Sequence, residues 1–453
     1  MFLATRMVLA ACPEEGATRE IALPMRLTPR PQSDAPTVTL RVGQSEATVA
    51  VTVSDGALSP RCVLLSRDLF KQLKLSEGDS LGVWRDTRQG IIRFGPVLGV
   101  MGKRYHKRLF GPSTEMIRWC VRQARVKGML AYAFAPQDID WHDRSVRGWV
   151  WSSRGLKRVK CPLPDVVYDR VSSRAAETAP SFVRTKEMLL ACPGLKYYNR
   201  SFFNKWDVHR MLEKHTRTKS YLPATEELSS VDVLEKFLKR FPVVYVKPAH
   251  GSHGAGIFRV TRAKAGYTYR LTRLNLPDRW GHTKGLAGIL AIVSRLMKNR
   301  QFVVQRGLRL ARIGGAPFDV RVLLQKNVRN KWTVQSMVAR VAEPGNVVSN
   351  LADGGHIVHP RQAMSLAFGG RVNSLRMTVL LRRIAKATAS TIETEMGFEL
   401  AEMGVDLGID TNAKIWVIEA NSRPGRETGE DGPRRISSSV QKLISFLRSR
   451  GLR

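Results

Sequence analysis

Two apolar runs decide the fold of the C-terminal half of this sequence: Gly404-Val-Asp-Leu-Gly-Ile-Asp410 and Ile415-Trp-Val-Ile-Glu-Ala-Asn421. The polar residues between them predict a β-hairpin with its turn near Asn412. Side chains alternate along a strand, so Glu419 and Asn421 are expected on one face. A two-residue turn at Asn412-Ala413 would place Asp406 opposite Glu419. Two carboxylates and an amide oxygen are hard ligands that suit Mg²⁺ bound to phosphates.

A second segment supplies a lysine beside a glycine-rich loop. Residues 242–248 read as a strand that ends at Pro248, since proline cannot donate to a sheet. Lys247 is therefore expected at the strand end. The loop that follows contains Gly251, Ser252, Gly254 and Gly256. Such glycines let backbone N–H groups approach phosphate oxygens, and a lysine adds a point charge.

A third segment, residues 317–324, predicts a strand with Asp319 and Arg321 on one face. Arg340 follows in a second apolar run, and Asn350 in a glycine-containing segment. Arginine can bind phosphate through two parallel hydrogen bonds. The simpler alternative is that Asp319 only orients Arg321.

The N-terminal part of the chain has a different sequence pattern. We predict an irregular segment over residues 1–35 and a small β-rich domain over 36–94, because short runs alternate with turn formers. Strand–helix–strand order over 95–197 predicts a small α/β domain, with a helix from about Ser113 to Lys127. A long helix is predicted near Ser374–Met396 within the last domain, residues 198–453.

Composition limits the possible classes. The 453 residues favour two or three domains. The formal net charge of +36 favours anionic partners, although much of it could be solvated surface. Five cysteines without paired spacing predict no disulfide framework, and no apolar run predicts a membrane span. We therefore expect a cytoplasmic protein.

Together these segments resemble the ATP-grasp superfamily, and most closely the YheC/YheD family of endospore coat-associated ATP-grasp proteins. The resemblance covers about residues 80–430 and includes Phe94-Gly-Pro-Val-Leu-Gly-Val100, Asn204-Lys-Trp-Asp-Val-His209 and Val304-Gln-Arg-Gly307. It implies an α/β and α+β multidomain chain, with an ATP-grasp fold preceded by a pre-ATP-grasp α/β domain and the β-rich domain.

The resemblance also implies residue roles. Lys205 and Lys247 would contact ATP phosphates, and Gln305 would lie at the adenine-side hinge, where many ATP-grasp enzymes have Glu. Arg321 and Arg340 would face the transferred phosphate, with Asn350 in a nearby loop. Asp406, Glu419 and Asn421 match the family's metal ligands for Mg²⁺ or Mn²⁺.

The implied activity is an ATP-dependent carboxylate–amine or carboxylate–thiol ligase that forms an acyl phosphate. The carboxylate and the nucleophile are not identified by the sequence. Two alternatives stay open. One is a non-catalytic ATP-binding protein associated with a spore coat. The other is a polyanion-binding protein, whose partner would be nucleic acid, another anionic polymer or an acidic peptide.

Overall fold

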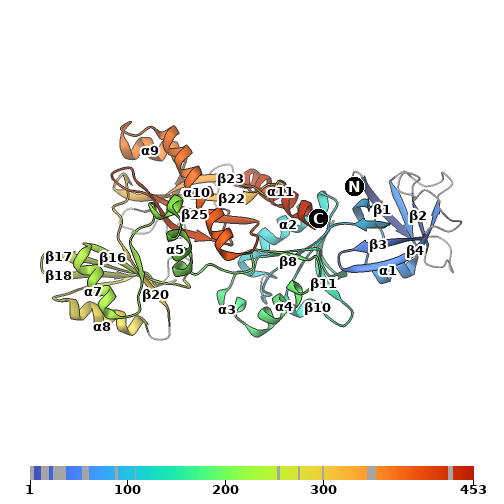
Figure 1. Ribbon diagram of the computed structural model, residues 1–453, viewed down its shortest axis with the longest axis horizontal. Coiled ribbons are helices and arrows are strands. Elements are labelled where there is room, and N and C mark those ends of the chain that lie inside the picture. Colours follow the sequence, from blue (N-terminus) through green and yellow to red (C-terminus); the bar gives the residue numbers. More distant parts are fainter. Residues whose placement is uncertain are drawn as a thin grey trace. The chain divides into compact units, whose positions relative to one another are not determined.

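The structure is a computed structural model that describes residues 5–11, 20–23, 37–53, 61–86, 90–107, 109–251, 256–273, 276–297, 300–343, 354–426 and 432–452. The chain forms two compact units (Figure 1). The first comprises residues 1–200, 327–331 and 437–453, and the second comprises 201–326 and 332–436. The finer domain boundaries predicted from the sequence stay predictions.

The first unit begins with a closed barrel, in which neighbouring strands pair in the order β1-β5-β2-β4-β3-β7-β6. Helix α1 follows β5, and the Ser66 hydroxyl caps it by accepting from the Leu69 amide. The elements are β1 (Thr5–Ala11), β2 (Glu20–Leu23), β3 (Thr37–Val42), β4 (Ser45–Val53), β5 (Cys62–Leu65), α1 (Arg67–Leu73), β6 (Ser80–Asp86) and β7 (Ile91–Phe94).

Strands β1 and β2 correct a prediction. The irregular structure expected over residues 1–35 is wrong for these two strands. Along β1 the buried Met7 and Leu9 alternate with the exposed Arg6 and Val8, which is a strand pattern. The pattern is short, and the partners β5 and β6 lie far along the chain, so local signals were too weak to reveal it.

An α/β sheet follows, with strand order β10-β11-β9-β8-β13-β14 and β12 paired to β11. Strands β8, β9, β13 and β14 pair in parallel, as the strand–helix–strand order predicted. The elements are β8 (Val97–Met101), α2 (Thr114–Val126), β9 (Leu130–Phe134), β10 (Ile139–Asp140), β11 (Ser145–Ser152), β12 (Gly155–Pro162), β13 (Val166–Asp169), α3 (Arg174–Glu177), α4 (Pro180–Leu190) and β14 (Lys196–Tyr198).

The second unit contains two sheets. The first has the order β15-β20-β16-β17-β18-β19 and is covered on one face by α7 and α8, so we call it the α7/α8 sheet (Figure 1). The elements of this half are α5 (Lys205–Glu213), α6 (Thr216–Lys219), β15 (Thr225–Glu227), α7 (Val231–Arg240), β16 (Val243–Pro248), β17 (Phe258–Ala263), β18 (Gly266–Leu271), β19 (Arg279–Thr283), α8 (Leu286–Met297) and β20 (Phe302–Arg306).

The second sheet has the order β24-β23-β22-β25-β26, with β21 paired to β22. Helix α10 packs on one of its faces, so we call it the α10 sheet. The predicted helix Ser374–Met396 is confirmed as α10. The elements are β21 (Arg312–Ile313), β22 (Ala316–Lys326), β23 (Trp332–Val341), β24 (His356–Val358), α9 (Pro360–Phe368), α10, β25 (Glu402–Ile409) and β26 (Ile415–Asn421). The last helix, α11 (Gly432–Gly451), belongs to the first unit from Ser437 onward.

Each sheet of the second unit keeps one face for its own core. Val244, Val246, Phe258 and Val260 pack with α7 and α8. Residues of β22, β23, β25 and β26 pack with α10 in the same way. The opposite faces are therefore available for polar side chains. In the parts of the chain that the structure describes, no helix has the length and apolar composition needed to cross a bilayer.

One buried acid in the first unit has a testable consequence for stability. The Asp165 side chain accepts a hydrogen bond of 2.8 Å from the Val97 amide. Burial raises the pKa of Asp165 to about 6, although this hydrogen bond and the guanidinium groups of Arg93 and Arg41 act to lower it. The folded carboxyl group therefore holds its proton at a pH where the unfolded group has lost it.

We expect Asp165→Asn to become more stable relative to wild type as pH rises. A raised carboxyl pKa stabilises the fold below the unfolded value, and this contribution is lost as pH passes about 6. Asparagine cannot ionise. The free energy of unfolding of the variant, relative to that of wild type, should therefore rise by roughly 2–3 kcal/mol between about pH 4 and pH 7. Urea titrations across this range would measure it. A difference between Asp165→Asn and wild type that does not change with pH would contradict it.

Candidate functional site

The hairpin of β25 and β26 brings two predicted acids together. Asp406 pairs with Glu419 and Gly404 pairs with Asn421, so the predicted pairing of Asp406 with Glu419 is confirmed. The predicted two-residue turn is wrong. The Asp410 amide donates to the Lys414 carbonyl, and Ala413 takes a left-handed backbone with φ +62°. This is a three-residue loop of the kind that ends in a left-handed residue.

A β-bulge restores the pairing that the longer turn would lose. The register shifts between Asp406 and Leu407, because Leu407 pairs with Val417 and leaves Ile418 as the extra residue. Val417 thus stays in the core under α10, while Glu419 pairs with Asp406 on the opposite face. Simple alternation would have placed Val417 and Glu419 on the same face.

Three strands of the α10 sheet gather charges on the face away from α10. Arg321 on β22 forms an ion pair with Asp406, and its Nη2 donates to Asp406 Oδ2 at 3.1 Å. Gly404 leaves space for this side chain, since an added Cβ would lie 3.2 Å from Arg321 Nη1. Arg340 Nη2 approaches Asp406 Oδ2 at 3.2 Å. Asp406 is therefore held by two guanidinium groups.

Asp319 holds Arg340, a partner that the sequence did not indicate for it. Arg340 Nε and Nη2 each donate to one Asp319 oxygen at 2.7 Å. The two residues pair directly across β22 and β23. The sequence showed only that Asp319 and Arg321 share a face, and both do face the site.

Helix α5 brings Lys205 to the same place. Asn204 caps the helix by accepting from the Trp206 and Asp207 amides. The Lys205 amide donates to the Ala249 carbonyl at 3.0 Å, and Lys205 Nζ donates to the Gly251 carbonyl at 2.8 Å. Nζ also lies 3.0 Å from Glu419 Oε1. Lys205 therefore links the strand end of β16 to the acidic hairpin.

Lys247 and Gln305 form the inner side of the site. Lys247 Nζ donates to Gln305 Oε1 at 2.7 Å, and Gln305 Nε2 donates to Thr225 Oγ1 at 2.9 Å. Burial lowers the pKa of Lys247 to about 8, with a further lowering from Lys205, while Glu419 acts to raise it. Lys247 is thus a cation whose charge can change near neutral pH.

A cavity lies beside these groups. Its polar end carries Lys205, Lys247, Gln305 and Glu419, and most of the remaining wall is apolar. Such a combination is typical of small-molecule and cofactor sites. The rest of the lining consists of Phe203, Val208, His209, Leu212, Leu222, Thr225, Val303, Val417, Ile418 and Ala420.

The apolar wall was not predicted. Val303 lies two residues from Gln305 on β20, so strand alternation could have indicated it. His209 and Leu212 lie on α5, where helical spacing from Lys205 gives a weaker signal. Burial lowers the pKa of His209, so its ring is an uncharged part of the wall.

The glycine-rich loop is only partly described. Ser252 and Gly254 lie outside the described residues, and so does Asn350. Gly251 forms a turn in which its amide donates to the Pro248 carbonyl at 3.2 Å. Gly256 has φ +76°, a conformation that favours glycine, and its amide donates to the Thr272 carbonyl at 2.8 Å.

The charges of the site indicate which ligand fits. Four cationic side chains (Lys205, Lys247, Arg321 and Arg340) meet three carboxylates (Asp319, Asp406 and Glu419), which leaves one positive charge in excess. Asp406, Glu419 and Asn421 are the oxygen donors that Mg²⁺ prefers. A bare divalent cation would be opposed by the surplus charge. A cation bound with polyphosphate fits both features.

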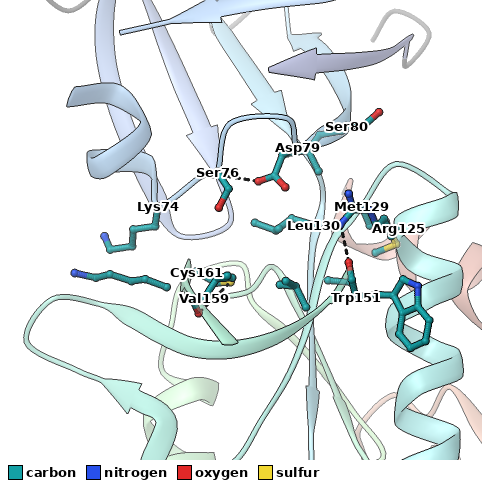
Figure 2. A pocket seen from close by; sticks show the side chains of 14 residues that line it. Lys74, Ser76, Asp79, Ser80, Arg125, Met129, Leu130, Trp151, Val159 and Cys161 are labelled. Atoms are coloured by element: carbon teal, nitrogen blue, oxygen red, sulfur yellow. Dashed lines mark hydrogen bonds between the residues drawn. The ribbon is translucent and has the colours of Figure 1, made fainter. Parts of the chain in front are cut away.

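A second cavity lies in the first unit, beneath the barrel (Figure 2). The Asp79 side chain accepts from the Ser76 amide at 2.9 Å, and Arg125 Nη1 donates to the Trp151 carbonyl at 2.6 Å. Burial raises the pKa of the Cys161 thiol well above its usual range, and Asp79 raises it further. A thiol that stays protonated is a poor nucleophile.

The fold and the charged site together define the class of this protein. Residues 194–449 match the family described as YheC/D like ATP-grasp, which is more than half of the chain, and the chain belongs to this family. The matched range includes both sheets of the second unit.

Relatives are known from Bacillus subtilis (strain 168). The endospore coat-associated protein YheD is 29% identical over 387 residues, which cover 85% of this chain and 84% of YheD. The endospore coat-associated protein YheC is 23% identical over 311 residues, 66% of this chain and 82% of YheC.

Solved structures with a similar fold include two synthetases. The D-cycloserine synthetase DcsG aligns with a TM-score of 0.48 at 14% identity, covering 77% of this chain and 99% of that chain. The D-alanyl-alanine synthetase A from Vibrio cholerae O1 biovar eltor aligns with a TM-score of 0.46 at 13% identity, covering 78% and 98%.

The buried pair of Arg340 and Asp319 should dominate the stability of the site. Asp319→Ala leaves Arg340 without its two short hydrogen bonds, so we expect the free energy of unfolding to fall by about 3 kcal/mol or more. The double variant Asp319→Leu/Arg340→Met should lose less. Denaturant titration would measure both. Glu226→Ala, which removes an exposed partner of Lys236, should cost about 1 kcal/mol or less. If Glu226→Ala lowered the free energy of unfolding as much as Asp319→Ala does, the pair of Arg340 and Asp319 would have no special role in stability.

Proposed function

We propose that this protein is an ATP-dependent ligase that joins a carboxylate to an amine, or to a thiol, through an acyl-phosphate intermediate. The observation that carries the proposal is the pairing of Asp406 with Glu419 on a sheet face that also holds Arg321 and Arg340. Two lysines approach this face from other elements, Lys205 from α5 and Lys247 from β16. Family membership supports ATP as the energy source. The proposed metal is Mg²⁺, or Mn²⁺ in its place.

In this proposal each group has one task. Lys205 and Lys247 bind the nucleotide phosphates, and the apolar wall beside Gln305 takes the adenine. Asp406, Glu419 and Asn421 hold the metal ion. When bound, the metal ion neutralises phosphate charge as the phosphoryl group is transferred.

Arg321, Arg340 and Asn350 are proposed to act on the transferred group. A substrate carboxylate oxygen attacks the γ-phosphorus and ADP leaves, which gives the acyl phosphate. The amine then attacks the carbonyl carbon, phosphate leaves, and the amine loses a proton. The arginine donors stabilise the charge that develops on the phosphoryl oxygens. Asp319 positions Arg340 through two hydrogen bonds.

A second candidate is a non-catalytic nucleotide-binding protein of the endospore coat. The names of YheD and YheC favour it, since both are described as endospore coat-associated. The charge arrangement favours catalysis, because a protein that only binds nucleotide has no need for both Arg321 and Arg340. An anionic polymer as partner, expected from the net charge, has no support in the family assignment. Release of ADP with candidate acceptors would separate the two functions.

The acidic hairpin should determine metal dependence. We expect Glu419→Gln to lose most of the gain in ATP affinity that Mg²⁺ gives, and to lose turnover by about 100-fold or more. Because the variant has one more surplus positive charge, its affinity for ATP in chelator should not fall. Calorimetry with and without Mg²⁺ would measure both affinities. For wild type, Mg²⁺ alone should give no detectable binding.

Glu226→Gln is the matched control, because Glu226 is an exposed partner of Lys236. It should retain wild-type Mg²⁺ dependence. If Glu419→Gln kept the same Mg²⁺ gain as this control, the assignment of the metal site would be wrong.

The lowered pKa of Lys247 predicts a pH dependence of nucleotide binding. A phosphate ligand raises the pKa of this lysine, so binding takes up a proton above about pH 8 and affinity falls as pH rises through that value. Calorimetry at about pH 8.5 in buffers of different ionisation enthalpy would measure the proton uptake. Lys247→Arg keeps its charge and should show little uptake. Equal uptake in both proteins would exclude Lys247 as its source.

A further inference from the structure

Helices α9 and α10 lie in a stretch of sequence that contains no acid. No aspartate or glutamate stands between Asp353 and Glu393. Every lysine and arginine of this stretch has an exposed side chain, namely Arg361, Arg371, Arg376, Arg382, Arg383 and Lys386. In the ranges that the structure describes, no carboxylate forms an ion pair with any of them. Glu393 and Glu395, the next acids on α10, pair instead with Lys326 and Lys214. The positive charge of these helices therefore faces solvent without neutralisation.

Three large apolar side chains are exposed among these cations. Leu366 on α9 is 58% exposed, and Leu375 and Val379 on α10 are 53% and 59% exposed. They are three of the ten large apolar side chains that are exposed in the described residues, and they come from two consecutive helices. Single exposed apolar residues are common, but a group of them indicates an interaction surface.

Helical spacing places most of these groups on one side of α10. Leu375 and Val379 are four residues apart, Arg382 follows three residues later, and Lys386 four residues after that, so the four lie in one line along the helix. The opposite side packs in the core. Helix α9 contacts α10 and adds its own exposed cation and leucine (Figure 1). We call the exposed apolar residues and cations of the two helices the α9/α10 face.

We propose that the α9/α10 face docks on an anionic lipid bilayer. The three apolar side chains enter the boundary between headgroups and acyl chains, while the cations meet the negative charges of the headgroups. Long arginine and lysine side chains suit this position, because their stems can lie along apolar groups while their charged ends stay in the headgroup layer.

Other occupants fit this face less well. A nucleic acid gains nothing from exposed leucine and valine, and the one aromatic residue of α9 and α10, Phe368, is buried and cannot stack on a base. A second copy of the chain would bring the same unpaired cations together. A protein partner is typically held by aromatic anchors, which this face lacks. A bilayer needs only apolar and cationic groups on one exposed surface.

Docking would leave the candidate site free. The inner side of α10 packs on the core face of the α10 sheet, whereas Arg321, Arg340 and Asp406 lie on its other face. A bilayer that contacts the outer side of α10 therefore does not touch these residues. Docking does not depend on the ligase reaction, and the two proposals can fail separately.

Vesicle sedimentation with the full chain tests the proposal. Vesicles of phosphatidylcholine with about 30% phosphatidylserine should bind the protein, and pure phosphatidylcholine should bind it about tenfold more weakly or less. Arg382→Gln/Lys386→Gln should weaken binding to the anionic vesicles by about tenfold or more, because two cations leave the face. Leu375→Gln/Val379→Gln keeps every charge and should weaken binding by about fivefold or more.

Each double variant has a matched control at exposed positions elsewhere. Lys264→Gln/Arg295→Gln removes the same two charges from the α7/α8 half of the second unit. Leu276→Gln/Val328→Gln replaces two apolar side chains that are 59% and 50% exposed. Because charges far from the contact are screened, the first control should stay within about twofold of wild type. The second should do the same, since its residues lie outside the face.

Three results would overturn the proposal. The first is absence of binding to the anionic vesicles. The second is binding that Leu375→Gln/Val379→Gln leaves unchanged, or that the charge control weakens as much as Arg382→Gln/Lys386→Gln does, because the total charge alone would then explain it. The third is tighter binding of soluble polyglutamate or of a single-stranded oligonucleotide, weakened by Arg382→Gln/Lys386→Gln. The face would then belong to an acidic protein or a nucleic acid.

Discussion

Burial of the Asp406 carboxylate imposes the arrangement of the site. A buried carboxylate is costly without cationic partners, and Asp406 obtains two, from β22 and from β23. Arg340 in turn needs Asp319, whose two oxygens accept from Arg340 Nε and Nη2. Because each partner comes from a different strand, the sheet must bring three strands into one register before any of these charges is satisfied.

Much of this site could be predicted from the sequence. The pairing of Asp406 with Glu419 was predicted, although from a turn that the chain does not form. The bulge at Ile418 made up for the extra residue in the turn. A signal for it was present, since Val417 belongs to an apolar core pattern and Glu419 does not, yet plain alternation puts both on one face. A conflict of this kind in a strand indicates a bulge.

Other features could not be predicted from local patterns. Lys205 lies on a helix whose sequence does not reveal what its first turn faces, and only the resemblance to a family indicated its role. The contact of Lys205 with Gly251 and Glu419 is set by packing between distant segments. The barrel strand β1 was missed for a related reason, because its neighbours β5 and β6 come much later in the chain. Long-range pairing leaves little trace in a short window of sequence.

The bulge at Ile418 also changes how length variation in this hairpin should be understood. A three-residue turn with one bulge and a two-residue turn without a bulge pair the same two positions. A homologous chain can therefore exchange one solution for the other while the number of residues between the two acids stays constant. A gap placed at the turn in an alignment, offset by an insertion in β26, would then describe one conserved geometry and not two different sites. The number of residues between Asp406 and Glu419 must stay constant for the two acids to pair, whereas the conformation of the turn can vary.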